Sequence, residues 1–234
     1  GDIGKIMQGL SKCFALEVLK VENCEVSPRH LEYLKDSKAL RSLSLPGNEL
    51  KELPLCVLEG KCWPSLQTLD LERCSLDSVP RFMSLRVLNM KSNRIKHIPK
   101  WLDDSKTVVE MMNNPLSSTG RVMKSILRLP EHCDFKRILT LDISSRGFSV
   151  LPEFDTFLPE LQHLNVSRNP LCTFPIVCSR TLTELIANNC GFRSLKGVGA
   201  YKKLKVLDIS SNPLGTFPIV CSSTLSELIA NNCG

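Results

Sequence analysis

The sequence predicts an α/β solenoid, in which short repeats stack side by side and share one parallel β-sheet. Three observations lead to this fold class. A block of 21 residues at 171–191 recurs at 214–234 with 18 identical positions. An apolar pattern fits the chain ten times at a nearly regular spacing. Within each copy, two apolar residues alternate with a polar one, which is the signature of a short half-buried strand.

The duplicated block gives the length of the repeat. Its two copies differ at three positions, which are Cys172/Gly215, Arg180/Ser223 and Thr183/Ser226. Their spacing of 43 residues equals two repeats of 22 and 21 residues, so the copied unit is a pair of repeats. Self-similarity with a period of about 20–29 residues is typical of a stacked solenoid.

The pattern L-x-x-L-x-L-x-x-N/C-x-L can be followed along the chain in ten rows. Close matches are "LRSLSLPGNEL" (40–50), "LQTLDLERCSL" (66–76) and "LKVLDISSNPL" (204–214). The rows begin at Leu16, Leu40, Leu66, Leu85, Lys106, Ile138, Leu161, Leu182, Leu204 and Leu225. One strand cannot bury its apolar face alone, so neighbouring rows must stack to form a continuous core. We therefore expect a short strand at the L-x-L of every row.

The ninth position of most rows carries Asn or Cys. An Asn side chain can hydrogen-bond the backbone where the chain turns away from the strand. Cys is small, tolerates burial and is a weaker donor. We expect these residues to form an interior structural ladder: Cys24, Asn48, Cys74, Asn93, Asn114, Asn169, Cys190, Asn212 and Cys233. In the sixth row Arg146 takes this position, and the pattern leaves that rung undecided.

One step between rows is 32 residues long and contains an insertion, "SSTGRVMKSILRLPEHCDFKR" at 117–137. Val122, Ile126 and Leu129 fall at i, i+4 and i+7, which predicts a short amphipathic helix packed on the solenoid. The basic residues of the segment fall largely on the other side of this helix: Arg121, Lys124 and Arg128.

The rows, together with following segments such as "LKELP" (50–54) and "LDSVP" (76–80), resemble the leucine-rich repeat family over nearly the whole chain. The resemblance implies a horseshoe with a parallel sheet on its concave side and irregular or helical segments on its convex side. It implies one repeat domain over residues 1–234, truncated within its last row. The proline after the strand is similar to the variety found in intracellular signalling scaffolds and in leucine-rich GTPase–kinase proteins. We therefore expect a non-catalytic protein-interaction module within a larger signalling protein.

The polar positions of the strands predict the binding surface. Alternate residues of a strand face the same side. The central x of L-x-L and the next exposed position therefore form two columns on the concave face. Binding surfaces combine polar groups with apolar anchors. The candidates for contact with a protein partner, whose identity the sequence does not give, are Asp70, Glu72, Asn89, Lys91, Glu110, Met112, Asp142, Asn165, Ile186 and Asp208.

Composition and motifs argue against other classes of function. The four histidines lie in different repeats and no cysteines are spaced as Cys-x-x-Cys, so we expect no metal, no cofactor and no enzyme activity. The net charge of +6 is mild and its basic residues are scattered, which argues against nucleic acid as a partner. No apolar stretch approaches the roughly 18 residues that a membrane span needs.

The eleven cysteines bear on the cellular compartment. Thiols at regular interior positions are easiest to keep in a reducing compartment. The cysteines outside the ladder do not form a clustered four-cysteine cap, so we expect a cytoplasmic protein. A second interpretation stays open, namely the ectodomain of a secreted or membrane-anchored receptor of the same repeat class. It requires that a signal peptide has been removed and that some cysteines form disulfides.

Overall fold

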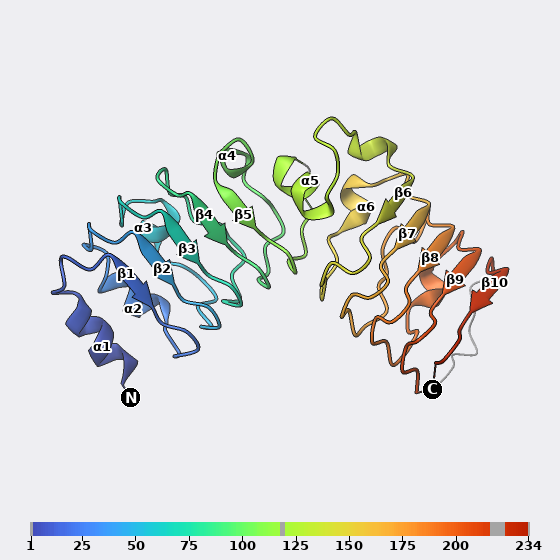
Figure 1. The fold of residues 1–234 in the computed structure, drawn as a ribbon, viewed down its shortest axis with the longest axis horizontal. Helices are drawn as coiled ribbons and strands as arrows, with labels where there is room; N and C mark the ends of the chain where they lie inside the picture. Colours follow the sequence, from blue (N-terminus) through green and yellow to red (C-terminus); the bar gives the residue numbers. More distant parts are fainter. Residues whose placement is uncertain (1, 118–119, 216–222, 234) are drawn as a thin grey trace. The chain divides into compact units, whose positions relative to one another are not determined.

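The computed structural model describes residues 2–117, 120–215 and 223–233 of the chain. The chain divides into two compact units. The N-terminal unit comprises Gly1–Leu116 and Gly120–Val122, and the C-terminal unit comprises Ser117–Thr119 and Met123–Gly234. Over the described ranges, each unit holds one five-stranded sheet whose strands run parallel and follow chain order (Figure 1).

All ten rows contain the predicted strand, one residue earlier than expected. The N-terminal sheet consists of β1 Val18–Lys20, β2 Ser42–Ser44, β3 Thr68–Asp70, β4 Val87–Asn89 and β5 Val108–Glu110. The C-terminal sheet consists of β6 Thr140–Asp142, β7 His163–Asn165, β8 Glu184–Ile186, β9 Val206–Asp208 and β10 Glu227–Ile229. Each strand therefore has the sequence x-L-x or its equivalent, with the apolar residue in the middle.

The middle residues of the strands form the sheet side of the core. Leu43, Leu69 and Leu88 are aligned in register across β2, β3 and β4, and each is at most 1 % exposed. Burying one such leucine contributes about 1.5–3 kcal/mol. The residues on either side of them point to the opposite face of the sheet, as at Ser44 and Asp70, which are only partly buried.

Helix α1 Ile3–Leu10 precedes the first strand, and further short helices lie in the segments that connect the strands. The connecting helices are α2 Pro28–Glu32, α3 Leu55–Leu58, α4 Lys100–Asp103, α5 Arg121–Leu127, α6 Phe154–Phe157 and the 3₁₀ helices η1 Phe135–Arg137 and η2 Val198–Ala200. Aromatic side chains fill the space beneath them; the indole N–H of buried Trp63 donates to the Leu34 carbonyl at 2.7 Å. Among these described helices, none is long and apolar enough to cross a membrane.

The ladder asparagines are buried and use both ends of the side-chain amide. Asn93 shows the arrangement: its Oδ1 accepts from the N–H groups of Cys74 (3.1 Å) and Leu76 (2.9 Å) in the preceding row. Its Nδ2 donates to the carbonyls of Leu71 (2.8 Å) and Met90 (3.0 Å). The amide therefore joins two rows and satisfies backbone groups at both turns. The same kind of bonding is made by Asn48, Asn114, Asn169 and Asn212.

The ladder cysteines join the rows differently. The buried thiols of Cys74 and Cys190 donate to carbonyls of the preceding rows at 3.2 and 3.3 Å. A thiol offers only a weak acceptor in place of the amide oxygen. The preceding turn instead donates to the cysteine backbone: the Lys51 N–H lies 3.0 Å from the Cys74 carbonyl, and the Cys172 N–H lies 3.0 Å from the Cys190 carbonyl.

Cysteine and asparagine at the ninth position are each associated with a different turn in the preceding row at several positions of the ladder. Before the Cys74 and Cys190 rungs, the twelfth residue of the row is left-handed, namely Lys51 (φ 62°) and Cys172 (φ 60°). Before the Asn48, Asn93 and Asn212 rungs, the tenth residue is left-handed, namely Glu25 (φ 57°), Ser75 (φ 59°) and Gly191 (φ 77°). At these rungs the side chain at the ninth position accompanies a change in the backbone of the row before it.

One ladder position departs from the prediction, and another is left undecided by the pattern. Cys24 was expected to be interior, but it is exposed and its thiol bonds the Glu22 carbonyl of its own row at 3.0 Å. β1 is an edge strand of its sheet, so no further strand stacks over this rung. The undecided Arg146 donates its guanidinium to the carbonyls of Leu127 and Asp142 at 2.5 and 2.8 Å. Arg146 therefore replaces the donor hydrogen bonds that an asparagine amide makes at this position, and it links the C-terminal end of α5 to the sixth row.

The insertion forms the predicted helix with a different buried face. Val122 is buried as expected, but Met123 and Leu127 are buried in place of Ile126 and Leu129. Asp103 accepts the N–H groups of the first two helical residues at 3.0 and 2.8 Å, and such a carboxylate stabilises a helix start. The Arg121 guanidinium, expected to face solvent, instead donates to backbone carbonyls around α4. Residues 118–119 of the insertion lie outside the described residues.

Replacing Asn93 by Ala should lower the free energy of unfolding by about 2–4 kcal/mol. The substitution removes four buried hydrogen bonds, each with a net contribution of about 0.5–1 kcal/mol. Urea denaturation measures the loss. Asn89→Ala in the same row is the matched control, because this amide lies at the surface and bonds only Glu72 and the Lys91 N–H. An equal loss in both variants would show that the ladder is not the stabilising feature.

Candidate partner-binding surface

The predicted contact residues fall into two groups, one on each sheet. Asp70, Asn89 and Glu110 are the third residues of β3, β4 and β5, and the parallel register aligns them side by side. The second predicted column follows two residues later in each row. We call these residues the N-terminal patch: Asp70, Glu72, Asn89, Lys91, Glu110 and Met112.

Charged side chains of the N-terminal patch interact across the rows. Lys91 Nζ lies 2.5 Å from Glu110 Oε2, and Asn89 Nδ2 donates to Glu72 Oε2 at 3.3 Å. Asp70 Oδ1 accepts the N–H of Glu72 at 3.1 Å. Within the patch one lysine therefore stands among three carboxylates, which leaves the patch with a net negative charge.

The surroundings of the Asp70 carboxylate disfavour its ionised form. Burial raises its pKa, and the negative charges of Glu72 and Glu22 raise it further, while the Glu72 N–H and Lys91 act in the opposite direction. The pKa of Lys91 is raised mainly by its hydrogen bond to Glu110. Because Lys91 is held by Glu110, the negative charge around Asp70 is only partly compensated.

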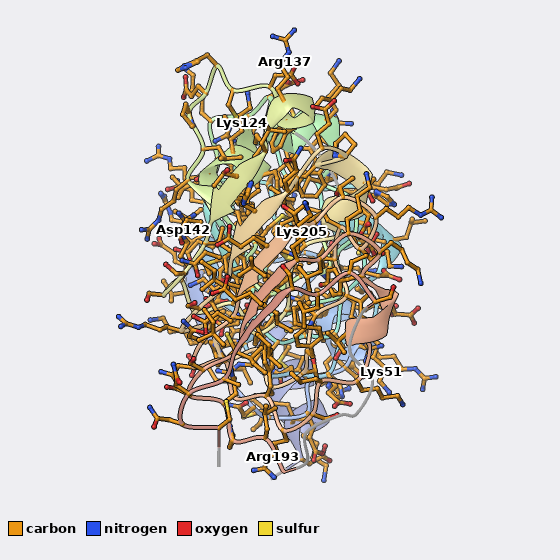
Figure 2. All side chains as sticks on the ribbon, turned by 90° about the vertical axis from the view of Figure 1, so that its right-hand side faces the viewer. Lys51, Lys124, Arg137, Asp142, Arg193 and Lys205 are labelled. Carbon is orange, nitrogen blue, oxygen red and sulfur yellow. The ribbon has the colours of Figure 1, made fainter. Side chains whose placement is uncertain are left out.

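The second group lies on the C-terminal sheet, where the register again aligns its members. We call them the C-terminal patch: Asp142, Asn165, Ile186 and Asp208. Asn165 Nδ2 donates to Asp142 Oδ2 at 3.3 Å, and Asp208 Oδ1 accepts the Ser210 hydroxyl at 2.8 Å. Figure 2 shows Asp142 at the margin of the ribbon, whereas Lys124 and Arg137 lie toward its upper end.

Asp70 and Asp142 occupy the same position in their rows and yet differ in pKa. The pKa of Asp142 is lowered, first by the Ser144 N–H that donates to it at 2.8 Å and then by Ser144, Asn165 and Arg146 side-chain interactions. Asp142 is also exposed, so burial opposes its ionisation less than at Asp70. The pKa of each carboxylate therefore depends on its burial and on the groups around it, and not on the repeat motif that the two share.

The first residues of the strands form a third column on the same sheet faces, and this column was not among the predicted contact positions. The first residue of each strand lies two positions before the central x, so the alternation that predicted the other columns predicts this one too. Val87 and Val108 belong to it and are 38 and 61 % exposed. In the C-terminal sheet this column brings His163 Nδ1 to 2.9 Å from Glu184 Oε2, beside a pocket of about 390 Å³ that Asp142 also lines.

The arrangement is suited to recognition by charge and shape. Its polar groups are carboxylates, amides and hydroxyls held in register by rigid strands, and stacked repeats of this kind use extended sheet surfaces for binding. In the described ranges, no cluster of three or more His, Cys, Asp or Glu side chains is placed to hold a metal ion.

Comparison with known proteins agrees with the repeat architecture. The family model described as Leucine Rich Repeat matches residues 203–231. Toll-like receptor 2 of Mus musculus is 31 % identical over 166 residues, which cover 67 % of this chain and 20 % of the receptor. Toll-like receptor 2 of Cricetulus griseus matches with the same identity and coverage. The chain thus spans about a fifth of the length of these curated relatives.

A solved structure entitled "Functional domain of InlJ from Listeria monocytogenes includes a cysteine ladder" also matches. It is 16 % identical, with a TM-score of 0.36, and the match covers 95 % of this chain and 55 % of the other. The matching family model, the repeated rows and their parallel strands define the class: this chain is a leucine-rich repeat protein.

Replacing Asp70 by Asn should raise the free energy of unfolding at neutral pH by less than about 1 kcal/mol, the range found for partly exposed charges. The raised pKa means that the folded protein binds this proton more tightly than the unfolded chain does. The free energy of unfolding therefore falls as pH rises from the pKa of Asp70 in the unfolded chain to its higher pKa in the folded protein. Asn removes the effect, and the gain should vanish in acid below the ordinary aspartate pKa of about 3.9.

Asp142→Asn is the matched control with the opposite sign. The pKa of Asp142 is lowered in the folded protein, so ionised Asp142 stabilises the fold at a pH above its pKa in the unfolded chain. This contribution is lost as the pH falls through the lower pKa of the folded protein. Urea denaturation of the two variants and the natural chain at both pH values measures the difference. If both substitutions shifted stability in the same direction at neutral pH, the electrostatic account of Asp70 would be wrong.

Proposed function

We propose that the chain is a non-catalytic protein-interaction module whose partner binds along the exposed face of its sheets. The observation that carries this proposal is the register of the N-terminal patch. Strands β3 to β5 hold Asp70, Asn89 and Glu110 in line. Fixed side chains lose less conformational freedom when a partner binds, which favours recognition by this surface.

The charge of the N-terminal patch favours a basic partner surface. Within the patch Glu72, Glu110 and Asp70 outnumber Lys91, and burial, followed by the negative charges of Glu72 and Glu22, raises the pKa of Asp70. A partner lysine or arginine placed between Asp70 and Glu72 would supply the missing positive charge. The partly buried Met112 offers an apolar contact beside the carboxylates. Such complementarity contributes mainly to specificity and to the rate of association.

The C-terminal patch would provide a separate set of contacts. Asp142 and Asp208 are its carboxylates, and the partly buried Ile186 stands between Asn165 and Asp208 in the register. The adjacent pocket, lined also by His163 and Glu184, is large enough to accept a side chain of a partner. Its acidic character again favours a basic residue there.

We place this module in a larger cytoplasmic signalling or scaffold protein. The proline that follows most strands is the feature that resembles intracellular leucine-rich repeat proteins. The buried thiols of Cys74 and Cys190 fit a reducing compartment, because their hydrogen bonds to backbone carbonyls use the reduced S–H form.

A second candidate function is that of a receptor ectodomain that senses an extracellular ligand. The similarity to Toll-like receptor 2 over 67 % of the chain favours this candidate. The pair Cys56 and Cys62 distinguishes the two. Burial, followed by the interaction with Cys56, raises the pKa of the Cys62 thiol to about 12. These two interacting thiols, six residues apart, are the pair expected to be disulfide-bonded in an oxidising compartment.

Reversing the charge of Asp70, Glu72 and Glu110 together to Lys should abolish partner binding. The immobilised chain would capture proteins from a lysate of its source cells, with captured partners quantified by mass spectrometry and confirmed with purified proteins. The captured amount of a basic partner should fall by about tenfold or more. The control reverses three exposed acids elsewhere in the same unit, Glu32, Asp36 and Glu52, with the same change in net charge. Equal capture by both variants would place the partner site elsewhere.

Counting free thiols on the native, unreduced protein separates the two compartments. For the cytoplasmic proposal, close to all eleven cysteines should react with a thiol reagent. For the receptor candidate, several should be paired, and peptide mapping should find the Cys56–Cys62 bond. The protein must be taken from its natural source without reducing agent, with a sample reduced before labelling as the control.

A further inference from the structure

A pocket of about 600 Å³ lies in the N-terminal unit beside the N-terminal patch, because its Val87 and Val108 stand two residues before Asn89 and Glu110 in β4 and β5. It is lined by the segment that leads into β4, by Trp101 of α4 and by the chain that enters β5. Its volume is in the range of about 300–1,000 Å³ that ligand sites in proteins occupy. The pocket therefore has room for a few side chains of a bound segment.

The apolar part of this pocket is unusually accessible. Met83 is 90 % exposed, Val108 is 61 % exposed and Val87 is 38 % exposed, and the register pairs the two valines directly. Trp101 is partly buried, and within the described residues its indole N–H has no hydrogen-bond partner, in contrast to that of Trp63. Exposed apolar side chains gathered in one hollow mark a binding surface more often than scattered ones do.

The polar part of the pocket is positively charged. Arg81, Arg86 and Lys106 line it, all three are exposed, and in the described part of the chain none forms an ion pair. No aspartate or glutamate is among the lining residues. Asp103 of α4 is already occupied by the N–H groups at the start of α5. The pocket is thus complementary to an anion that carries an apolar group.

We propose that this pocket binds an acidic segment of a partner protein in which an apolar side chain is flanked by Asp or Glu. The apolar side chain would lie on Met83, Val87 and Val108. The flanking carboxylates would meet the surrounding cations, and the Trp101 N–H would donate to the segment. The pocket of about 600 Å³ has room for a few side chains of such a peptide segment, and an anionic membrane surface is the alternative occupant that the experiment tests.

The proposal rests on the proposed function only in that the segment belongs to a protein. It adds a second site with the opposite preference, since the N-terminal patch favours basic groups and the pocket favours acidic ones. The two sites can fail independently. Peptide binding that the pocket variants leave unchanged would count against the pocket alone, whereas the charge reversal in the N-terminal patch tests the proposed function.

Fluorescence anisotropy tests the pocket with the full 234-residue chain. The probe is a short fluorescein-labelled peptide with Leu-Phe between two runs of Glu. Comparison peptides carry Ser-Ser in place of Leu-Phe, or Lys in place of Glu. The first peptide should bind at least about tenfold more tightly than either comparison peptide, and its affinity should fall as salt is added.

Variants then locate the site. Arg86→Glu with Lys106→Glu should weaken binding by about tenfold or more, and Val108→Ser should weaken it with no change of charge. Lys35→Glu with Lys38→Glu, at exposed positions outside the pocket, changes the net charge equally and should leave binding intact. Thermal melts followed by circular dichroism confirm that each variant is folded.

Three results would overturn the proposal. Equal weakening by the Lys35 and Lys38 control would mean general charge attraction. Equal binding of the Ser-Ser peptide would remove the role of the apolar surface. Binding to phosphatidylserine vesicles that the peptide cannot compete with, and that the pocket variants abolish, would identify a membrane surface as the occupant instead.

Discussion

The structure depends on one recurring interaction, in which the buried side chain at the ninth position of most rows bonds the backbone of its neighbours. Strands of three residues offer few hydrogen bonds to one another, and the turn after each strand exposes N–H and carbonyl groups that must find partners. Asn93 supplies two acceptor bonds and two donor bonds to these groups. Each ladder amide therefore sets the distance and the register between two rows, and every surface column inherits that register.

The surface follows from this constraint. Because the rows are aligned residue by residue, side chains that are about twenty residues apart in sequence stand next to each other, as Asp70, Asn89 and Glu110 do. The same alignment lets neighbouring charges change one another's behaviour. Asp70 and Asp142 share a motif, but burial and then Glu72 and Glu22 raise the pKa of the first, whereas Ser144 lowers the pKa of the second. A surface built this way can carry different chemistry on adjoining columns without any change in the fold.

Much of the fold could be read from the sequence because its period is set by leucines and asparagines whose roles are local. The strands, the helix of the insertion and most of the ladder follow from spacing alone. The exposure of Cys24 could not, since it depends on which strand ends the sheet. The role of Arg146 could not either, because it requires the position of the end of α5. The third column was readable from the alternation that gave the other two, but the pocket beside Val108 also needed the placement of α4.

The two kinds of turn have a consequence for how such a protein can grow. Cys74 and Cys190 each go with a left-handed residue at the end of the row before them, so the cysteine and this residue form one unit that crosses the row boundary. The repeated block 171–191 contains both parts, the left-handed Cys172 and the Cys190 carbonyl that it bonds. In the second copy Gly215 replaces Cys172 and is not left-handed, and the Leu214 N–H bonds the Cys233 carbonyl at 3.0 Å instead. A recombination break just before Leu171 transfers the turn together with its acceptor, whereas a break at the start of a row would separate them.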